Sequence, residues 1–196
     1  LMIFLLIETI IQVTLPELHV TWLCVTLLSV LYFIYCSEMW NQLDALTGLL
    51  NQNSYLNRTA EMRRRGGVLV VFDVDDFKQI NDRYGHLQGD ICLAEIGHCI
   101  KKAYARSGYC YRTGGDEFCV LMENADREAQ CAQEFVRQLE QRRKAVDFLP
   151  TVSFGSAPFF GEDVLAVKNR ADQEMYRHKK ARKPDAEGEM AEGERG

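Results

Sequence analysis

Apolar positions divide the chain into an apolar beginning and a longer, patterned remainder. Residues 1–15 and 20–36 are almost continuously apolar, and a short polar stretch at 16–19 separates them. From residue 44 onward, apolar side chains recur at helical or strand spacing between polar and glycine-rich stretches. The pattern predicts an apolar helical segment followed by a globular domain.

The patterned part predicts helices that alternate with strands. Because hairpin-linked strands mix with crossover helices, we predict an α+β fold, a ferredoxin-like sandwich of the nucleotidyl-cyclase type. Its central sheet contains antiparallel strands and carries flanking helices. The helices are predicted at 52–65, 77–84, 91–106, 127–144 and 163–180, and the strands at 68–73, 109–112, 117–121 and 150–157.

The most informative stretch is Arg-Thr-Gly-Gly-Asp-Glu-Phe at residues 112–118. Gly114 and Gly115 allow a tight turn and a close approach of the backbone to a ligand. Asp116 and Glu117 follow at once, and carboxylates are hard oxygen ligands that suit Mg²⁺. The sequence therefore predicts that this hairpin meets a metal-bound polyphosphate. The alternative is a surface hairpin that merely ends in two acids.

A second acidic cluster follows the apolar run 68–72, which predicts a buried strand near the centre of the sheet. The run ends in Asp-Val-Asp-Asp at 73–76, and open α/β sheets place ligands at such strand ends. If the two strands are neighbours, Asp73 and Asp116 form a divalent-metal site. The alternative for Asp73 and Asp75 is capping of the next helix. No P-loop motif occurs, so any nucleotide is held in another way.

Residues 44–183 resemble a GGDEF domain, the catalytic domain of diguanylate cyclases. Five segments carry the resemblance in order. They are Asp-Ala-Leu-Thr-Gly-Leu-Leu-Asn at 44–51, the stretch 72–90 that begins Phe-Asp-Val-Asp-Asp-Phe-Lys, Gly-Gly-Asp-Glu-Phe at 114–118, Thr-Val-Ser-Phe-Gly at 151–155, and Ala-Asp-Gln-Glu-Met-Tyr-Arg-His-Lys at 171–179.

The resemblance implies a reaction in which two GTP molecules condense to cyclic di-GMP and release two pyrophosphates. The 3′-hydroxyl of each GTP attacks the α-phosphate of the other across a homodimer. The resemblance assigns Mg²⁺ or Mn²⁺, two per active half-site, to Asp73, Asp116, Glu117 and the carbonyl of Val74. Asp116 and Glu117 are the implied catalytic residues, and Glu117 also helps to activate the hydroxyl. Such chemistry depends on positioning and charge neutralisation.

The resemblance also implies how GTP is held. Guanine is recognised by an amide and a carboxylate, and the phosphates meet backbone N–H groups at a helix start. Alternatively, Asn81 bonds within its own loop, Asp90 caps a helix, and Lys179 belongs to a solvated helix end. The implied substrate-binding residues are Asn81 and Asp90 for guanine, and Asp76, Phe77, Lys78, Gly114, Gly115, Lys179 and Lys183 for the phosphates.

The chain departs from the family pattern at several positions. Gln52 and Asn53 stand where two arginines are usual, and Lys183 stands where the family has an arginine. Lysine neutralises a phosphate without the bidentate fork of arginine. The family often carries Arg-x-x-Asp before the hairpin, where this chain has Ala105 and Gly108. We therefore predict no inhibitory product site.

The ends of the chain predict its placement in the cell. We expect residues 1–36 to contain one or two transmembrane helices from the end of a longer sensor, since about 17 apolar residues is the lower limit for a span. A soluble amphipathic hairpin is the alternative. Residues 37–43 then form a junction helix, and residues 184–196 a disordered acidic tail. Because GTP is cytosolic, the catalytic domain lies in the cytoplasm, at the inner (cytoplasmic) membrane.

Composition excludes some function classes. The net charge of −5 gives no reason to propose a nucleic-acid partner. Seven cysteines without zinc spacing indicate reduced core residues. Two hypotheses remain, an active membrane-anchored diguanylate cyclase and a catalytically silent GTP-binding receptor or dimerisation module. The acids Asp73, Asp116 and Glu117 are intact, which favours the enzyme.

Overall fold

The computed structural model describes residues 6–7, 10, 13–14, 20–40, 42–62 and 65–182. The chain forms two compact units, Leu1–Gln42 and Leu43–Gly196. Lys183 and the predicted tail lie outside the described residues.

The first unit contains helix α2 (Val20–Trp40), whose described side chains are mostly apolar and exposed. This helix continues into the predicted junction at 37–43. Among the described residues, no helix is both long and apolar enough to cross a membrane. This finding differs from the prediction of one or two transmembrane helices in residues 1–36, of which only part is described.

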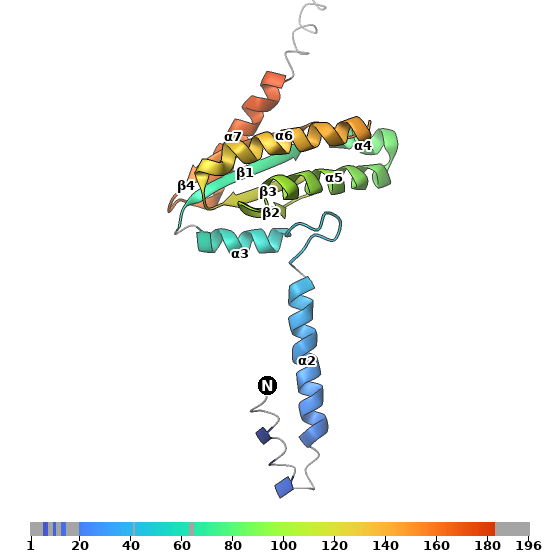
Figure 1. The fold of residues 1–196 in the computed structure, drawn as a ribbon, viewed down its shortest axis with the longest axis vertical. Coiled ribbons are helices and arrows are strands. Elements are labelled where there is room, and N and C mark those ends of the chain that lie inside the picture. Colours follow the sequence, from blue (N-terminus) through green and yellow to red (C-terminus); the bar gives the residue numbers. More distant parts are fainter. Residues whose placement is uncertain are drawn as a thin grey trace, which may run out of the picture. The chain divides into compact units, whose positions relative to one another are not determined.

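The second unit contains every helix and strand that the sequence predicts (Figure 1). Its elements are α3 (Gln52–Met62), β1 (Gly67–Val74), α4 (Phe77–Tyr84), α5 (His86–Tyr104), β2 (Gly108–Arg112), β3 (Glu117–Met122), the 3₁₀ turn η1 (Ala125–Arg127), α6 (Glu128–Ala145), β4 (Val152–Phe159) and α7 (Val164–Arg182).

The largest error in the predicted boundaries concerns α5, which begins at His86 rather than at residue 91. Gly85 separates α4 from α5 with a φ of 86°, a value that glycine adopts without strain. The next helix therefore starts directly after this glycine. Asp90 lies inside α5 and does not cap it, so the capping alternative for this residue is wrong.

The strands form one antiparallel sheet in the order β2-β3-β1-β4. This confirms an α+β fold with an antiparallel sheet and flanking helices, and it places β1 between two neighbours, as its continuous apolar run predicts. In the register, Asp73 of β1 lies opposite Glu117 of β3 and Ser153 of β4. The two predicted acidic clusters therefore meet at one end of the sheet.

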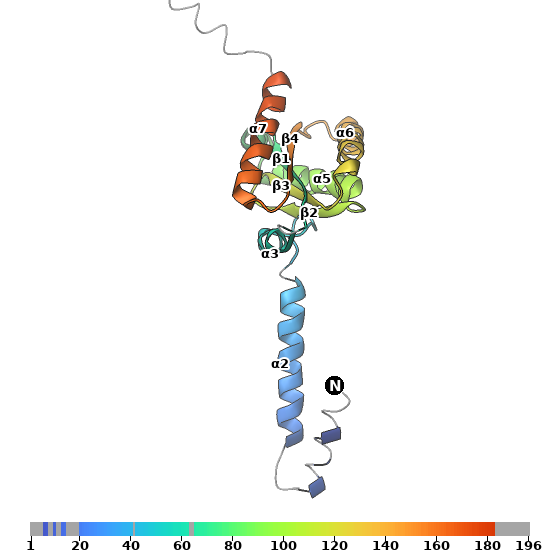
Figure 2. The ribbon, with the colours of Figure 1, turned by 90° about the vertical axis from the view of Figure 1, so that its left-hand side faces the viewer.

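Side chains alternate between the two faces of β1. Val70 and Phe72 pack in a core with residues of α5 and α6, whereas Leu69 and Val71 pack with residues of α3 and α7. Figure 2 shows α7 on one side of the sheet and the pair α5 and α6 on the other. By the same alternation, the next position after Phe72 places Asp73 on the α7 side.

The cysteines of the domain are free and buried, as predicted for core residues. Cys92, Cys99, Cys110 and Cys119 all lie within the packed interior. Burial raises the pKa of the Cys110 thiol to about 12. A thiol with so high a pKa carries almost no thiolate at neutral pH and is chemically inert.

Candidate active site

The site is built where β1 ends and β3 begins. Asp73 and Glu117 are direct partners in the register of these two strands. Both alternate with buried phenylalanines, Phe72 and Phe118, that face the opposite core, so both carboxylates lie on the α7 side. The backbone carbonyl of Asp116 accepts a hydrogen bond from the Val74 N–H at 3.3 Å. The four residues predicted to hold metal are thus brought together.

Helix α7 supplies a cation to the acid at the end of β1. The Lys179 ammonium lies 2.7 Å from Asp73 Oδ2 and 3.3 Å from Asp75 Oδ1. Partial burial lowers the pKa of Lys179, but its two acidic partners outweigh that effect and leave the pKa raised. Lys179 is therefore charged and directed at the predicted metal ligand, which differs from the alternative of a solvated helix end.

Asp75 has a structural position rather than a capping one. Its buried carboxylate accepts hydrogen bonds from Thr151 Oγ1 at 2.7 Å and Ser153 Oγ at 2.8 Å. Burial raises the pKa of Asp75, but the two hydroxyls and Lys179 outweigh it, so the pKa is lowered. Asp75 joins the end of β1 to β4, so the alternative that it caps the following helix is wrong.

Two residues at this site are absent from the sequence prediction. Lys168 Nζ lies 3.2 Å from Glu117 Oε2. Asp172 lies one helical turn further along α7, and its pKa is raised by burial and by the nearby Glu117 and Asp73 carboxylates, against the lowering effect of Lys168. These residues line a cavity of about 20 Å³, the room of a single water molecule.

A sequence signal for the missed residues exists. Lys168, Asp172, Met175 and Lys179 are spaced by four, three and four positions. That spacing places them on one face of a helix. The face could be found from the sequence, but its acidic partners come from distant strands.

The hairpin is held by Arg112, a residue to which the sequence analysis assigns no role. Its guanidinium donates to the carbonyl oxygens of Gly115 at 2.8 Å and Gly114 at 3.2 Å, and to the Asp44 carboxylate at 3.2 Å. Asp44 is itself fixed by Thr47, whose backbone N–H and hydroxyl both donate to Oδ1. Burial raises the pKa of Asp44, but Thr47 and Arg112 outweigh it and lower the pKa.

The predicted guanine-binding residues lie on two consecutive helices, α4 and α5. Asn81 Oδ1 is buried and has no hydrogen-bond partner among the described residues. A Cβ on Gly89 would lie only 2.0 Å from this oxygen, so Gly89 leaves the space that Asn81 occupies. Asp90 follows Gly89 on the exposed side of α5. A buried amide oxygen without a partner is suited to a ligand that donates a hydrogen bond.

The predicted phosphate-binding turn precedes α4. Asp76 has a φ of 55°, in the left-handed region that residues other than glycine rarely adopt. Such strain is concentrated at functional sites. Phe77 and Lys78 form the first turn of α4, where backbone N–H groups lack intrahelical acceptors.

The oxygen donors of the site determine which metal ion it can hold. Within the described ranges, no three or more His, Cys, Asp and Glu side chains cluster closely enough to hold a metal by themselves. Mg²⁺, however, is usually bound by one or two carboxylates together with substrate phosphates and water. Asp73, Glu117 and the Val74 carbonyl are all hard oxygen donors, and two lysine ammoniums already lie against the two acids. The site therefore fits a hard divalent cation that arrives with a nucleotide.

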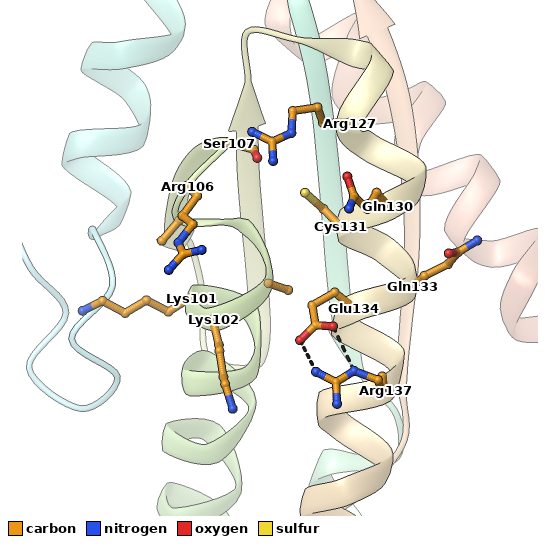
Figure 3. Close-up of a pocket in the computed structure, with 12 residues that line it drawn as sticks. Lys101, Lys102, Arg106, Ser107, Arg127, Gln130, Cys131, Gln133, Glu134 and Arg137 are labelled. Carbon is orange, nitrogen blue, oxygen red and sulfur yellow. Dashed lines mark hydrogen bonds and ion pairs between the residues drawn. The ribbon is translucent and has the colours of Figure 1, made fainter.

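A basic groove of about 760 Å³ lies between α5 and α6, away from this site (Figure 3). Ala105 lines it at the position where the family often has arginine, and Gly108 lacks the matching acid. The absence of an inhibitory product site stays a prediction. The cationic side chains of the groove are Lys101, Lys102, Arg106, Arg127 and Arg137, the last of which pairs with Glu134 at 2.6 Å.

Comparison with known families gives one extended match. The family model described as "Diguanylate cyclase, GGDEF domain" matches residues 41–184, nearly three quarters of the chain.

Curated relatives are similar over the same region. Diguanylate cyclase DgcP of Pseudomonas aeruginosa is 38% identical over 156 residues, which cover 70% of this chain and 22% of DgcP. Diguanylate cyclase DgcS of Shewanella oneidensis is 41% identical over 92 residues, which cover 44% of this chain and 31% of DgcS. The chain spans less than a third of the length of either relative.

Among solved structures, the coiled coil and GGDEF domain of DgcB from Caulobacter crescentus, in complex with c-di-GMP, is similar with a TM-score of 0.69. The sequence identity is 26%, and the match covers 81% of this chain and 93% of that one.

Proposed function

The chain belongs to the GGDEF family of diguanylate cyclase domains, and from this premise we propose that it condenses two GTP molecules into cyclic di-GMP with release of two pyrophosphates. The observation that carries the proposal is the pairing of Asp73 with Glu117 at adjoining strand ends, with Asp116 beside them. Asp73 and Glu117 belong to separate segments of the chain, and the fold gathers them on one side of the sheet.

The reaction forms one phosphodiester bond at each half-site. The 3′-oxygen of one GTP attacks the α-phosphorus of the other, and the bond from that phosphorus to the bridging oxygen of the β-phosphate breaks. Glu117 is half-exposed and helps to take up the hydroxyl proton. Asp73, Asp116, Glu117 and the Val74 carbonyl would hold Mg²⁺ or Mn²⁺, two ions per half-site, which when bound neutralise the charge of the triphosphate.

The remaining predicted residues orient the nucleotide. We assign guanine to Asn81 and Asp90, because the buried Asn81 oxygen lacks a partner and can accept a hydrogen bond from the base. The first turn of α4 and the hairpin glycines approach the phosphates with backbone N–H groups. Lys179 is charged at the edge of the site and can neutralise a phosphate as a point charge. Lys183 keeps the same predicted role.

Turnover requires a homodimer under this proposal. One domain binds one GTP, so two domains must face each other with two-fold symmetry before a bond can form. The partners are therefore GTP and a second copy of the chain.

We further propose that residues 1–36 attach the catalytic domain, residues 44–183, to the inner membrane from the cytoplasmic side. The support is the exposed apolar surface of α2, where Leu23, Tyr32 and Phe33 are all well exposed. In fractionated cells, the whole chain should sediment with membranes and resist alkaline extraction, whereas a form without residues 1–36 should not. Recovery of the whole chain in the supernatant would contradict the attachment.

The test of the cyclase is GTP turnover with Mg²⁺ by the chain fused to a forced dimer, with products separated by chromatography. Cyclic di-GMP and pyrophosphate are expected in a ratio of about one to two. Asp116→Ala and Glu117→Gln should lower the rate by at least about 10²-fold, while Glu123→Gln, an exposed acid beyond the site, should leave it unchanged. Binding of GTP without product would favour the receptor module.

A further inference from the structure

We propose that Lys168 is a positioning residue that competes with a divalent cation for Glu117 and thereby sets the metal affinity of the site. The inference rests on the proposed function, because it concerns the same acid.

The contact itself is the first support. Lys168 Nζ lies 3.2 Å from Glu117 Oε2, and the side chains are 32% and 51% exposed. The backbone of Glu117 is fixed in the sheet opposite Asp73, so its carboxylate is available to whichever cation lies on the α7 side. In this structure that cation is the ammonium of Lys168.

The surroundings hold Lys168 at the site. It lines the same small cavity as Asp73, Glu117 and Asp172, and Asp172 lies one turn away on the same face of α7. The ammonium is therefore directed at the acids by its own helix. A divalent cation that binds Glu117 meets this positive charge nearby and must take the carboxylate from it.

The two lysines of α7 differ in how firmly they are held. Lys179 pairs with both Asp73 and Asp75, and Asp75 is anchored to β4. Among the ion pairs of the described residues, Lys168 has Glu117 as its single partner. Its charge can therefore be removed without leaving a buried acid such as Asp75 unpaired.

The charge of Lys168 is expected to weaken the binding of a divalent cation. Like charges a few ångströms apart repel even near the protein surface, so an ammonium beside a cation site weakens that site. Removing the charge frees Glu117 and removes the repulsion. We expect the dissociation constant for Mn²⁺ to fall about tenfold in Lys168→Met, while Lys168→Arg, which keeps the charge, stays within about twofold of the wild type.

The experiment titrates the whole chain with Mn²⁺ alone and measures free Mn²⁺ by electron paramagnetic resonance. Lys144→Met is the matched control, because it removes one exposed lysine from α6, on the opposite side of the sheet. The same comparison is made in a Glu117→Gln background. There the effect of Lys168→Met should shrink to about twofold, because the contested carboxylate is gone.

Three results would overturn the inference. They are an unchanged or weaker Mn²⁺ affinity in Lys168→Met, an equal gain in Lys144→Met, and an undiminished gain in the Glu117→Gln background. A role in packing alone would lower the thermal midpoint without a change in Mn²⁺ affinity, which is the first of these results.

The outcome is separable from that of the proposed function, because the titration needs no turnover. If the chain makes no cyclic di-GMP but Lys168→Met binds Mn²⁺ more tightly than the wild type, the proposed cyclase activity is refuted and this inference is supported. If the chain makes cyclic di-GMP but the Mn²⁺ affinity is unchanged in Lys168→Met, the proposed cyclase activity is supported and this inference is refuted.

Discussion

At the scale of single residues, the Asp44–Arg112 pair holds the hairpin between β2 and β3. Arg112 reaches the carbonyls of Gly114 and Gly115 with the same guanidinium that binds Asp44. Both side chains of the pair are largely buried. The carboxylate thus acts on the hairpin from the segment before α3, through one arginine.

Asp44→Asn should therefore destabilise the domain in a pH-dependent way. Thr47 and Arg112 outweigh burial and hold the pKa of Asp44 below its unfolded value of about 3.9. The contribution is present above that value and is lost as pH falls through the folded pKa. We expect a cost of about 1–3 kcal/mol at pH 7 that shrinks below about pH 4, measured by urea unfolding.

The matched control for that measurement is Asp147→Asn, which changes an exposed acid before β4. It should alter the free energy of unfolding by less than about 0.5 kcal/mol at either pH. A cost for Asp44→Asn that persists unchanged at pH 3 would show that the charge of this residue is not what stabilises the fold.

A second residue-scale prediction concerns Gly89. An added Cβ would lie 2.0 Å from Asn81 Oδ1, so Gly89→Ala must displace the predicted guanine-binding amide. Affinity for a non-hydrolysable GTP analogue should fall about five- to thirtyfold, equivalent to about 1–2 kcal/mol, by calorimetry. Alanine is favoured over glycine inside a helix, so weaker binding cannot be attributed to a weaker α5. Leu87→Ala, at a side chain that is 72% exposed, should bind normally.

At the scale of elements, hydrophobic periodicity predicts each helix and strand of the second unit. The apolar run that forms β1 predicts a strand near the centre of the sheet. The glycine-tipped turn predicts the hairpin between β2 and β3. The predicted start of α5 is wrong, because Gly85 alone separates the two helices. The local sequence pattern does not distinguish a one-residue break from a loop. The structural role of Asp75 could not be predicted for another reason, since its partners Thr151 and Ser153 lie far away in the sequence.

The contact between β4 and α7 gives a prediction for these two elements. A Cβ on Gly155 would lie 2.3 Å from the Met175 nitrogen and 2.4 Å from the Ala171 oxygen. The backbone atoms can make room only if the helix moves, so Gly155→Ala should lower the free energy of unfolding by about 1–3 kcal/mol. The thermal midpoint should fall by about 2–4 °C for each kcal/mol. Ser156→Ala, on the opposite face of β4, should shift it by less, and equal shifts would count against this packing.

At the scale of the whole molecule, the composition of the site could be predicted and its internal charge balance could not. Asp73, Asp116 and Glu117 stand in recognisable motifs. Lys168 meets Glu117 only because α7 docks on one face of a sheet whose register is set elsewhere. Long-range contacts of this kind depend on the packed fold rather than on local spacing.

The proposed two-fold reaction gives the last prediction. Each half-site forms one bond, so a dimer with a single Glu117→Gln subunit stops at a linear product. With random pairing, adding an equal amount of Glu117→Gln to the wild type leaves about a quarter of all dimers fully wild type. Cyclic di-GMP output should then fall to about half of that from the same wild type alone, measured by chromatography at a concentration where dimers dominate.

A covalently linked wild-type dimer provides the control, because its subunits cannot exchange. Its output should be unaffected by the same addition of Glu117→Gln. If unlinked wild type is equally unaffected, each chain completes the reaction without a partner. The active unit would then be the single domain, and the dimer requirement would have to be abandoned while the assignments of Asp73 and Asp116 stand.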